Sequence, residues 1–199
     1  MNVKLIAALA AGLLSAPGFA AASILDFEGP TSFDPIGDFY SSLGVSFGLD
    51  GLALSNDELG PYYSHSPSPG TVFAPVGPDA TMNVAGGFAG NISFAYSSKL
   101  ASSVSLYSGL DGTGTLLGTL NLTANAQNGC TDSPLCFWSL ASLDFTGIAK
   151  SLTFGGLANQ AMFDDVTFSA PVPLPAAGWL MMSALGGLGA WARRKRAAA

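Results

Sequence analysis

The sequence predicts an all-β domain with the architecture of an antiparallel β-sandwich. Apolar residues recur with a period of two from Ser23 onward, as in NISFAY at 91–96. Gly and Pro separate these short runs, as turn residues separate strands. No stretch before the C-terminal segment has the 3.6-residue period of a helix. Strands without intervening helices favour antiparallel pairing over a βαβ arrangement.

Taken in order, the pattern predicts about ten strands with polar turns between them. The first, SILDFE at 23–28, places Leu25 and Phe27 on one face. A Pro- and Ser-rich loop is expected at 55–70, and the sequence DGTG at 111–114 indicates a hairpin turn because Gly tolerates positive φ. The other expected strands are 45–47, 71–73, 81–84, 91–96, 103–107, 116–123, 137–145, 148–154 and 162–169.

Charge is scarce and strongly one-sided in the middle of the chain. Charged residues make up only 10% of the sequence, against about 25% in an average protein. Between Asp26 and Asp165, thirteen acids face only Lys99 and Lys150, so thirteen negative and two positive charges give a net charge of −11. Phosphate contacts need clustered cations, which argues against nucleic acid as a partner. The composition is typical of a secreted all-β protein.

The first 22 residues have the organisation of a secretory signal peptide. Lys4 precedes the apolar run 5–14, the dipeptide at 17–18 is Pro-Gly, and three alanines at 20–22 supply the small residues of a cleavage site. The apolar run is too short to span a membrane in the mature protein. We expect cleavage after Ala22, with cleavage after Ala20 as the second choice.

The C-terminal segment, 170–199, combines a Pro-rich hexapeptide, an apolar stretch and four consecutive cations. Residues 176–192 carry no charge and would extend about 26 Å as a helix, close to the thickness of a hydrocarbon core. Trp179 and Trp191 near its two ends suit the headgroup level. We therefore expect a transmembrane helix at 176–192, followed by a basic tail at 193–196 that stays cytoplasmic.

This segment resembles a PEP-CTERM sorting signal in its VPLPA variant, with Leu174 where the parent motif has Glu. The residues that carry the resemblance are Val172, Pro173, Leu174, Pro175, Ala176, Ala177, Arg193, Arg194, Lys195 and Arg196. The resemblance implies an exported bacterial protein whose inner-membrane-anchored precursor is processed by exosortase, a membrane-embedded cysteine transpeptidase. It also implies a final place at the cell surface or outside the cell, with exopolysaccharide or biofilm. The alternative is an ordinary single-pass anchor, which would have no need of the prolines.

The intervening residues resemble the ectodomains of PEP-CTERM proteins in YSSLGVSF, YSGLDGTGTLLGTL and FDDVTFS. This second resemblance implies a jelly-roll-like sandwich. The expected organisation is a signal peptide at 1–22, one β-sandwich ectodomain at 23–169 and the sorting signal at 170–199.

The two cysteines, Cys130 and Cys136, lie in the turn-like segment GCTDSPLC. Two thiols without a histidine nearby in sequence make a poor zinc site, and an exported protein favours a disulfide instead. The segment GVSFG at 44–48 matches the G-x-S-x-G nucleophile elbow, but strand residues flank Ser46 and no helix follows. The single histidine, His65, has no orienting acid close by in its loop. We therefore expect no enzymatic activity.

Asp164 is the most informative acid, because strict alternation places residues 162, 164, 166 and 168 on one buried face. A buried carboxylate needs a partner, and backbone donors or a bound Ca²⁺ are the candidates. Jelly-roll domains often carry a structural calcium between their first and last strands. Glu28 or Asp26 is then expected beside Asp164 and Asp165. The alternative is a bulge that turns Asp164 to solvent.

If the domain has a ligand surface, we expect Tyr62, Tyr63 and His65 to form it, since aromatic rings at a rim can stack against a sugar. The favoured interpretation of the two tyrosines is that they cover the end of the core. The favoured function is that of a non-enzymatic exported surface or matrix protein. The alternative is a carbohydrate-binding module with a structural calcium, which requires an exposed aromatic platform in this loop or near Trp138. A hydrolase is disfavoured because suitable catalytic side chains are few.

Overall fold

Nine antiparallel strands make up the part of the chain that the computed structural model describes, residues 22–154 and 158–169. They are β1 (Ala22–Leu25), β2 (Val45–Phe47), β3 (Gly51–Ser55), β4 (Thr71–Pro75), β5 (Thr81–Ser98), β6 (Ser102–Tyr107), β7 (Leu116–Leu122), β8 (Ser139–Thr153) and β9 (Ala161–Ser169). The only helical element within these residues is the 3₁₀ turn η1 (Ser41–Leu43). The order along the sheet is β3-β4-β9-β5-β8-β6-β7, with β1 beside β9 and β2 beside β5. The predicted all-β antiparallel class is confirmed.

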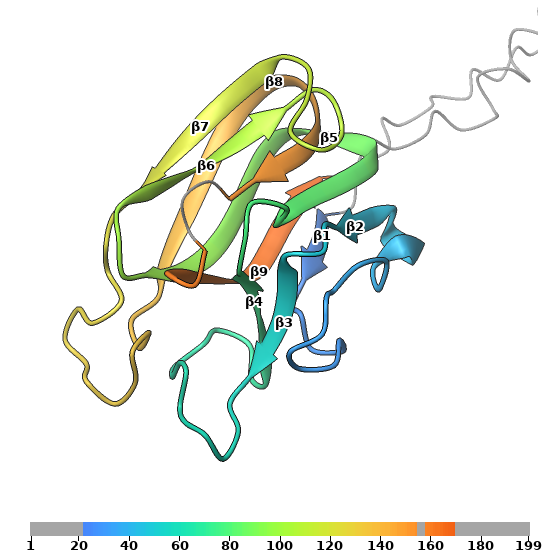
Figure 1. The fold of residues 1–199 in the computed structure, drawn as a ribbon. Coiled ribbons are helices and arrows are strands. Elements are labelled where there is room, and N and C mark those ends of the chain that lie inside the picture. The colour runs from blue at the N-terminus through green and yellow to red at the C-terminus, as the bar shows by residue number, and fades with distance from the viewer. Residues whose placement is uncertain (1–21, 155–157, 170–199) are drawn as a thin grey trace, which may run out of the picture.

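The sheet curls around one main hydrophobic core. The two longest strands, β5 and β8, pair with each other and also with strands on both sides of that core. β5 pairs with β8 along most of its length, while its other edge pairs first with β2 and then with β9. Buried side chains from all nine strands meet in this core. Figure 1 shows β6, β7 and β8 on one side of the molecule and β1, β3 and β4 on the other, which is consistent with the predicted sandwich.

Two pairs of strands that the sequence predicts as separate are each one strand. Segments 81–84 and 91–96 both belong to β5, and 137–145 and 148–154 lie largely within β8. In β5, Gly87 and Gly90 have φ values of 73° and 87°, and the register to β8 shifts around them. A Cβ on Gly87 would lie 2.4 Å from the side chain of Ile148. Glycine therefore bends and bulges the strand without ending its ladder, where the sequence pattern indicated a turn.

A bulge in β9 changes which of its residues share a face. Asp165 has a φ of 50°, and the register to β5 shifts at this point. As a result, Phe163 and Val166 both contribute to the main core, whereas Met162 belongs to a smaller cluster beneath the loops. The predicted alternation over 162–168 is wrong, because it assumed that no residue is inserted. The bulge does not expose Asp164, which is fully buried.

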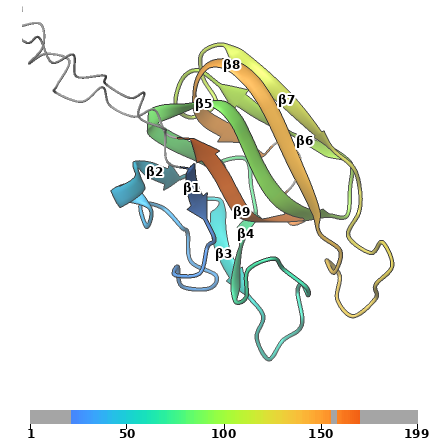
Figure 2. The ribbon, with the colours of Figure 1, turned by 180° about the vertical axis from the view of Figure 1, so that it is seen from behind.

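The two ends of the described chain lie together, away from the longest loops. Ala22 of β1 pairs with Ser169 of β9. The loops 56–70 and 123–138 project from the opposite end of the sheet (Figures 1 and 2). The predicted sorting motif, transmembrane helix and, apart from Ala22, signal peptide fall outside the described residues. Within those residues, no helix is long and apolar enough to cross a membrane.

Candidate functional site

A groove with a volume of about 380 Å³ lies over β3, β4 and β9. The strand residues that line it are apolar and include Leu52 and Leu54 from β3, Ala74 from β4 and Met162 from β9. Their neighbours along the strands, such as Phe73, face the main core instead. The alternation of β3 and β4 therefore gives this part of the sheet two apolar faces, and the groove occupies the outer one.

Two aromatic side chains border the groove. Phe33 and Tyr62 both line it, with ring centroids 5.7 Å apart and an edge-to-face angle of 82°. Phe33 is 48% exposed, and its φ of 66° is a conformation that costs a residue with a Cβ about 1–2 kcal/mol. The Phe33 N–H donates to the Ala53 carbonyl at 2.8 Å, which ties this strained turn to β3. The fold thus ties the backbone of an exposed aromatic residue to β3, beside an apolar surface.

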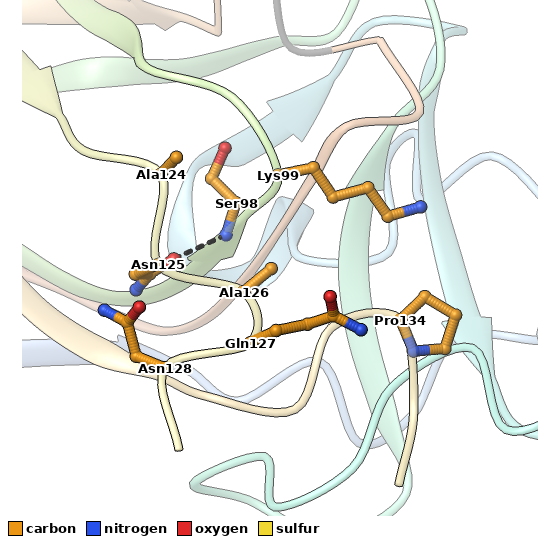
Figure 3. Close-up of a pocket in the computed structure, with 8 residues that line it drawn as sticks. All are labelled: Ser98, Lys99, Ala124, Asn125, Ala126, Gln127, Asn128 and Pro134. Atoms are coloured by element: carbon orange, nitrogen blue, oxygen red, sulfur yellow. Dashed lines mark hydrogen bonds between the residues drawn. The ribbon is translucent and has the colours of Figure 1, made fainter. Parts of the chain in front are cut away.

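Lys99 lies where the apolar groove meets a second, polar pocket of about 340 Å³. Figure 3 shows this pocket, which Lys99 borders together with Gln127, Asn128 and Pro134. Lys99 and Pro134 line both spaces, so the two are adjacent at these residues. Within the described residues, Lys99 forms no salt bridge and neither lining contains an Asp or Glu. An uncompensated cation and two amide side chains therefore lie beside the apolar groove.

The three predicted ligand residues, Tyr62, Tyr63 and His65, do not form one surface. Tyr62 lines the groove, but Tyr63 is only 3% exposed and donates its hydroxyl to the carbonyl of Gly70. Burial is the main cause that raises the pKa of Tyr63 to about 12. Its ring packs edge to face against Trp138 in the smaller cluster. Tyr63 therefore covers a core, as the favoured interpretation of the two tyrosines predicts, and does not belong to a ligand surface.

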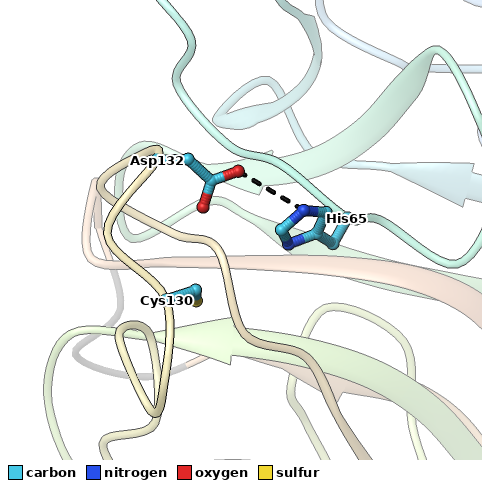
Figure 4. A group of neighbouring side chains, drawn as sticks. All are labelled: His65, Cys130 and Asp132. Atoms are coloured by element: carbon cyan, nitrogen blue, oxygen red, sulfur yellow. Dashed lines mark ion pairs between the residues drawn. The ribbon is translucent and has the colours of Figure 1, made fainter.

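His65 lies at a corner where the two long loops meet (Figure 4). Its Nε2 atom is 3.4 Å from Oδ2 of Asp132, and its Nδ1 atom is 3.2 Å from the carbonyl oxygen of Cys136. Cys130 and Cys136 form a disulfide, which confirms that prediction. The acid beside His65 thus comes from the other loop, and a reading of the local sequence could not find it.

Asp164 is buried beneath the loop 56–70 and accepts hydrogen bonds from three donors. The N–H and hydroxyl of Ser68 donate to it at 3.0 and 2.8 Å, and the Asp165 N–H donates at 2.8 Å. The Ser68 hydroxyl also lies 3.0 Å from the carbonyl of Asp26. Burial raises the pKa of Asp164 to about 6, against the lowering effect of these hydrogen bonds. Asp164 therefore anchors the loop that carries Tyr62 to β9.

The residues predicted to hold Ca²⁺ do not present a shared set of ligands. Ca²⁺ takes six to eight oxygen ligands, whereas the oxygens of Asp164 already face N–H and O–H donors. Glu28 accepts a backbone N–H at the start of β4. Within the described residues, one group of three metal-ligating side chains has its ligand atoms within 4.8 Å of one another: His65, Cys130 and Asp132. As placed, Glu28, Asp164 and Asp165 do not form a set of ligands that fits Ca²⁺.

Sequence patterns did not indicate Phe33, Lys99 or Asn159, which also line the groove. The signal that could have pointed to Phe33 is a large apolar residue isolated in a polar loop, and for Lys99 it is the rarity of cations in the domain. Nothing in the sequence places them beside Tyr62, because they come from separate connections between strands.

No protein-family model matches the chain, and no curated protein matches it. Among solved structures, CsCBM6-3 from Clostridium stercorarium in complex with cellobiose is 17% identical, with a TM-score of 0.40 over 63% of this chain and 86% of that one. A β-1,3-glucan-binding CBM6 from Bacillus halodurans is 15% identical, with a TM-score of 0.41 over 63% and 89%. CBM29_1, a family 29 carbohydrate-binding module from Piromyces equi, is 11% identical, with a TM-score of 0.41 over 76% and 91%. Likenesses of this strength assign no ligand to this chain.

Proposed function

We propose that this protein is an exported bacterial surface or matrix protein whose β-domain binds polysaccharide in the groove beside Phe33 and Tyr62. The observation that carries the proposal is the exposed ring of Phe33, whose backbone is tied to β3, next to Tyr62 over an apolar surface. Sugar rings present C–H faces that pack on aromatic rings, and hydroxyls that bond to polar side chains. Phe33 and Tyr62 supply the rings, and Lys99 and Asn159 supply polar groups.

The size of the site favours a polymer. Small-ligand pockets are typically about 300–1,000 Å³, so the groove and the polar pocket are each large enough for one small ligand. They share Lys99 and Pro134, which makes them two consecutive subsites. A chain of sugars that leaves the aromatic rings would pass Lys99 and reach the amides of Gln127 and Asn128.

Lys99 gives the groove a local preference for a sugar carboxylate, although the net charge of −11 over residues 26–165 opposes the binding of a long polyanion. It is one of two cations in 23–169, and no described acid lines either space. A uronic acid carboxylate beside Lys99 forms an exposed ion pair, which contributes about 0.2–1 kcal/mol. This corresponds to a preference of roughly 1.4- to fivefold over the neutral sugar.

Export and sorting are proposed from the terminal sequences. The segment 1–22 directs export, and the tail 170–199 makes the precursor an exosortase substrate anchored in the membrane. The position of Ser169 supports this arrangement, because it lies at the end of the sheet opposite the loops that border the groove. A domain tethered after Ser169 presents those loops away from the membrane.

Affinity electrophoresis of the mature chain, in gels that contain a neutral β-glucan or a polyuronate, tests the proposal. Phe33→Ala and Tyr62→Ala should each weaken binding by at least about tenfold, since central aromatic anchors typically contribute about 2 kcal/mol or more. The matched control is Phe39→Ala, which removes a ring that is 54% exposed but does not line the groove. Phe39→Ala should bind as the wild type does.

The charge preference has its own pair of variants. Lys99→Gln should weaken polyuronate binding about 1.4- to fivefold and leave binding of the neutral glucan unchanged. Lys150→Gln removes the other cation of the domain, from β8, and should change neither. Wild-type mobility that no polysaccharide retards, or equal retardation of the Phe33→Ala, Tyr62→Ala and wild-type proteins, would contradict the proposal.

A further inference from the structure

A second cluster of reactive side chains lies where the loops 56–70 and 123–138 meet. Ligand atoms of His65, Cys130 and Asp132 lie within 4.8 Å of one another (Figure 4). Cys130 is bonded to Cys136, and their Cα atoms are 6.0 Å apart. A metal ion binds the thiolate form of cysteine, which the disulfide does not offer. Reduction of the disulfide therefore makes two cysteine ligands available beside His65 and Asp132.

We propose that the reduced form of this corner is a Zn²⁺ site held by Cys130, Cys136, His65 and Asp132. A dithiol reductant supplies two electrons, the S–S bond breaks, each cysteine sulfur takes up one proton, and the dithiol becomes a disulfide. Zn²⁺ then replaces the two thiol protons, which pass to solvent. Two thiolates, one imidazole and one carboxylate complete the four-coordinate shell that zinc prefers.

The backbone separation of the cysteines suits both states. Two Zn–S bonds of about 2.3 Å at a tetrahedral angle place the sulfur atoms about 3.8 Å apart. The Cα atoms, at 6.0 Å, lie within reach of that separation by side-chain rotation. The side chains of His65 and Asp132 are 65% and 50% exposed, so an ion reaches the corner from solvent.

The histidine is oriented as a metal ligand. Its Nδ1 atom lies 3.2 Å from the Cys136 carbonyl, and an N–H at Nδ1 donates to that oxygen. The neutral ring then has its lone pair on Nε2, the atom that lies 3.4 Å from the Asp132 carboxylate. Metal-bound histidines typically donate their other ring N–H to a carbonyl or carboxylate in this way. A cation between Nε2 and the carboxylate satisfies two acceptors that otherwise face each other.

The two loops are held together without the disulfide. The Ser64 N–H donates to the Leu135 carbonyl at 3.1 Å, and the Ser64 and Ser133 hydroxyls are 2.9 Å apart. The indole N–H of Trp138 donates to the Ser64 carbonyl at 2.8 Å. These bonds keep His65 beside the segment 130–136 after reduction. Leu135 also lines the groove, so exchange of the disulfide for zinc acts on one wall of that site.

The full mature chain, reduced with a phosphine under anaerobic conditions and then desalted, tests the proposal. Zinc affinity is measured by competition with a chromophoric chelator, and Co²⁺ serves as the spectroscopic probe of thiolate and histidine ligation. The reduced chain should bind one Zn²⁺, and the oxidised chain should bind none at the same concentrations. Loss of an outer-sphere partner costs about 10–100-fold in metal affinity, so loss of a ligand in His65→Ala or Asp132→Ala should cost at least about tenfold.

Asp38→Ala is the matched control, since Asp38 is exposed and does not belong to the cluster. It should bind zinc as the reduced wild type does. The proposal is overturned if the reduced chain binds no zinc, or if His65→Ala and Asp132→Ala retain wild-type affinity. Loss of the β-sheet circular dichroism signal on reduction, without recovery when zinc is added, would overturn it as well.

Discussion

The hydroxyl of Ser68 links the loop that carries Tyr62 to the buried carboxylate of Asp164. In Ser68→Ala, Asp164 loses a hydroxyl donor at 2.8 Å and keeps two N–H donors, from residues 68 and 165. A hydrogen bond to a charged group contributes about 1.5–3 kcal/mol. We expect the free energy of unfolding to fall by about 2 kcal/mol at pH 8. For a domain of this size, the melting temperature should then fall by about 4–8 °C.

The cost of Ser68→Ala should depend on pH. Folding raises the pKa of Asp164 from its ordinary value of 3.8 to about 6, so the folded state binds this proton more tightly than the unfolded state does. The stability that the group contributes is complete below about pH 4 and is lost as the pH rises through 6, a change of about 3 kcal/mol. At pH 5 the protonated carboxyl can donate to the Ser68 oxygen, whose own proton turns to the Asp26 carbonyl. Ser68→Ala then removes neutral hydrogen bonds, at a cost of about 1 kcal/mol.

Denaturant unfolding at pH 5 and pH 8, followed by tryptophan fluorescence, measures both costs. Ser66→Ala is the matched control, because the Ser66 hydroxyl donates at 2.7 Å to the Ser68 carbonyl, an acceptor that does not titrate. Ser66→Ala should lower the free energy of unfolding by the same amount at both pH values. An equal cost of Ser68→Ala at both pH values, or a cost below about 0.5 kcal/mol at pH 8, would refute the role given to this hydroxyl.

Three further predictions concern the disulfide, calcium and the tail. Unreduced exported protein should show no free thiol at Cys130 or Cys136, and the disulfide should contribute about 2 kcal/mol to the free energy of unfolding on the chain-entropy model. Quantitative labelling of both thiols in native material would rule the disulfide out. Ca²⁺ and chelators should leave the melting temperature unchanged, because Asp164 already has three protein donors; a Ca²⁺-dependent rise that Asp164→Asn abolishes would establish a calcium site instead. In the producing cell, wild type should lose its tail and the double variant Pro173→Ala, Pro175→Ala should keep it, because the prolines hold the recognition segment extended. Identical, uncleaved intact masses would contradict sorting.

The period-two pattern predicted the all-β class and several strands, because alternating burial is a local property. β2 spans Val45–Phe47 as expected, so Ser46 of the elbow-like motif lies within a strand. The pattern failed where a strand bends. Gly87 and Gly90 resemble a turn in sequence, and it is the pairing of Phe88 and Gly90 with β8 that continues the ladder across the two register shifts. The bulge at Asp165 could not be predicted from the sequence either, because a bulge is defined by the register of the partner strand.

The candidate site was predictable only where its parts are close in sequence. The disulfide joins cysteines six residues apart, and Tyr62 lies in an aromatic-bearing loop. Adjacent aromatic residues give no sign of which one faces inward, so Tyr63 could not be separated from Tyr62. The other parts of the site depend on contacts between loops that are distant in sequence. Phe33 contacts Tyr62 and His65 contacts Asp132, and no local sequence pattern predicts either contact.

Binding at the groove is tested most directly by NMR of the isotope-labelled mature protein, titrated with an oligosaccharide of a polyuronate. The amide shifts that change should gather at Phe33, Tyr62 and Lys99, which line the groove. They should spare the outer face of β8, where Leu140 is 78% exposed and offers a competing apolar surface. Shifts confined to the surroundings of Leu140, or a groove whose amides do not move at saturating oligosaccharide, would contradict the account.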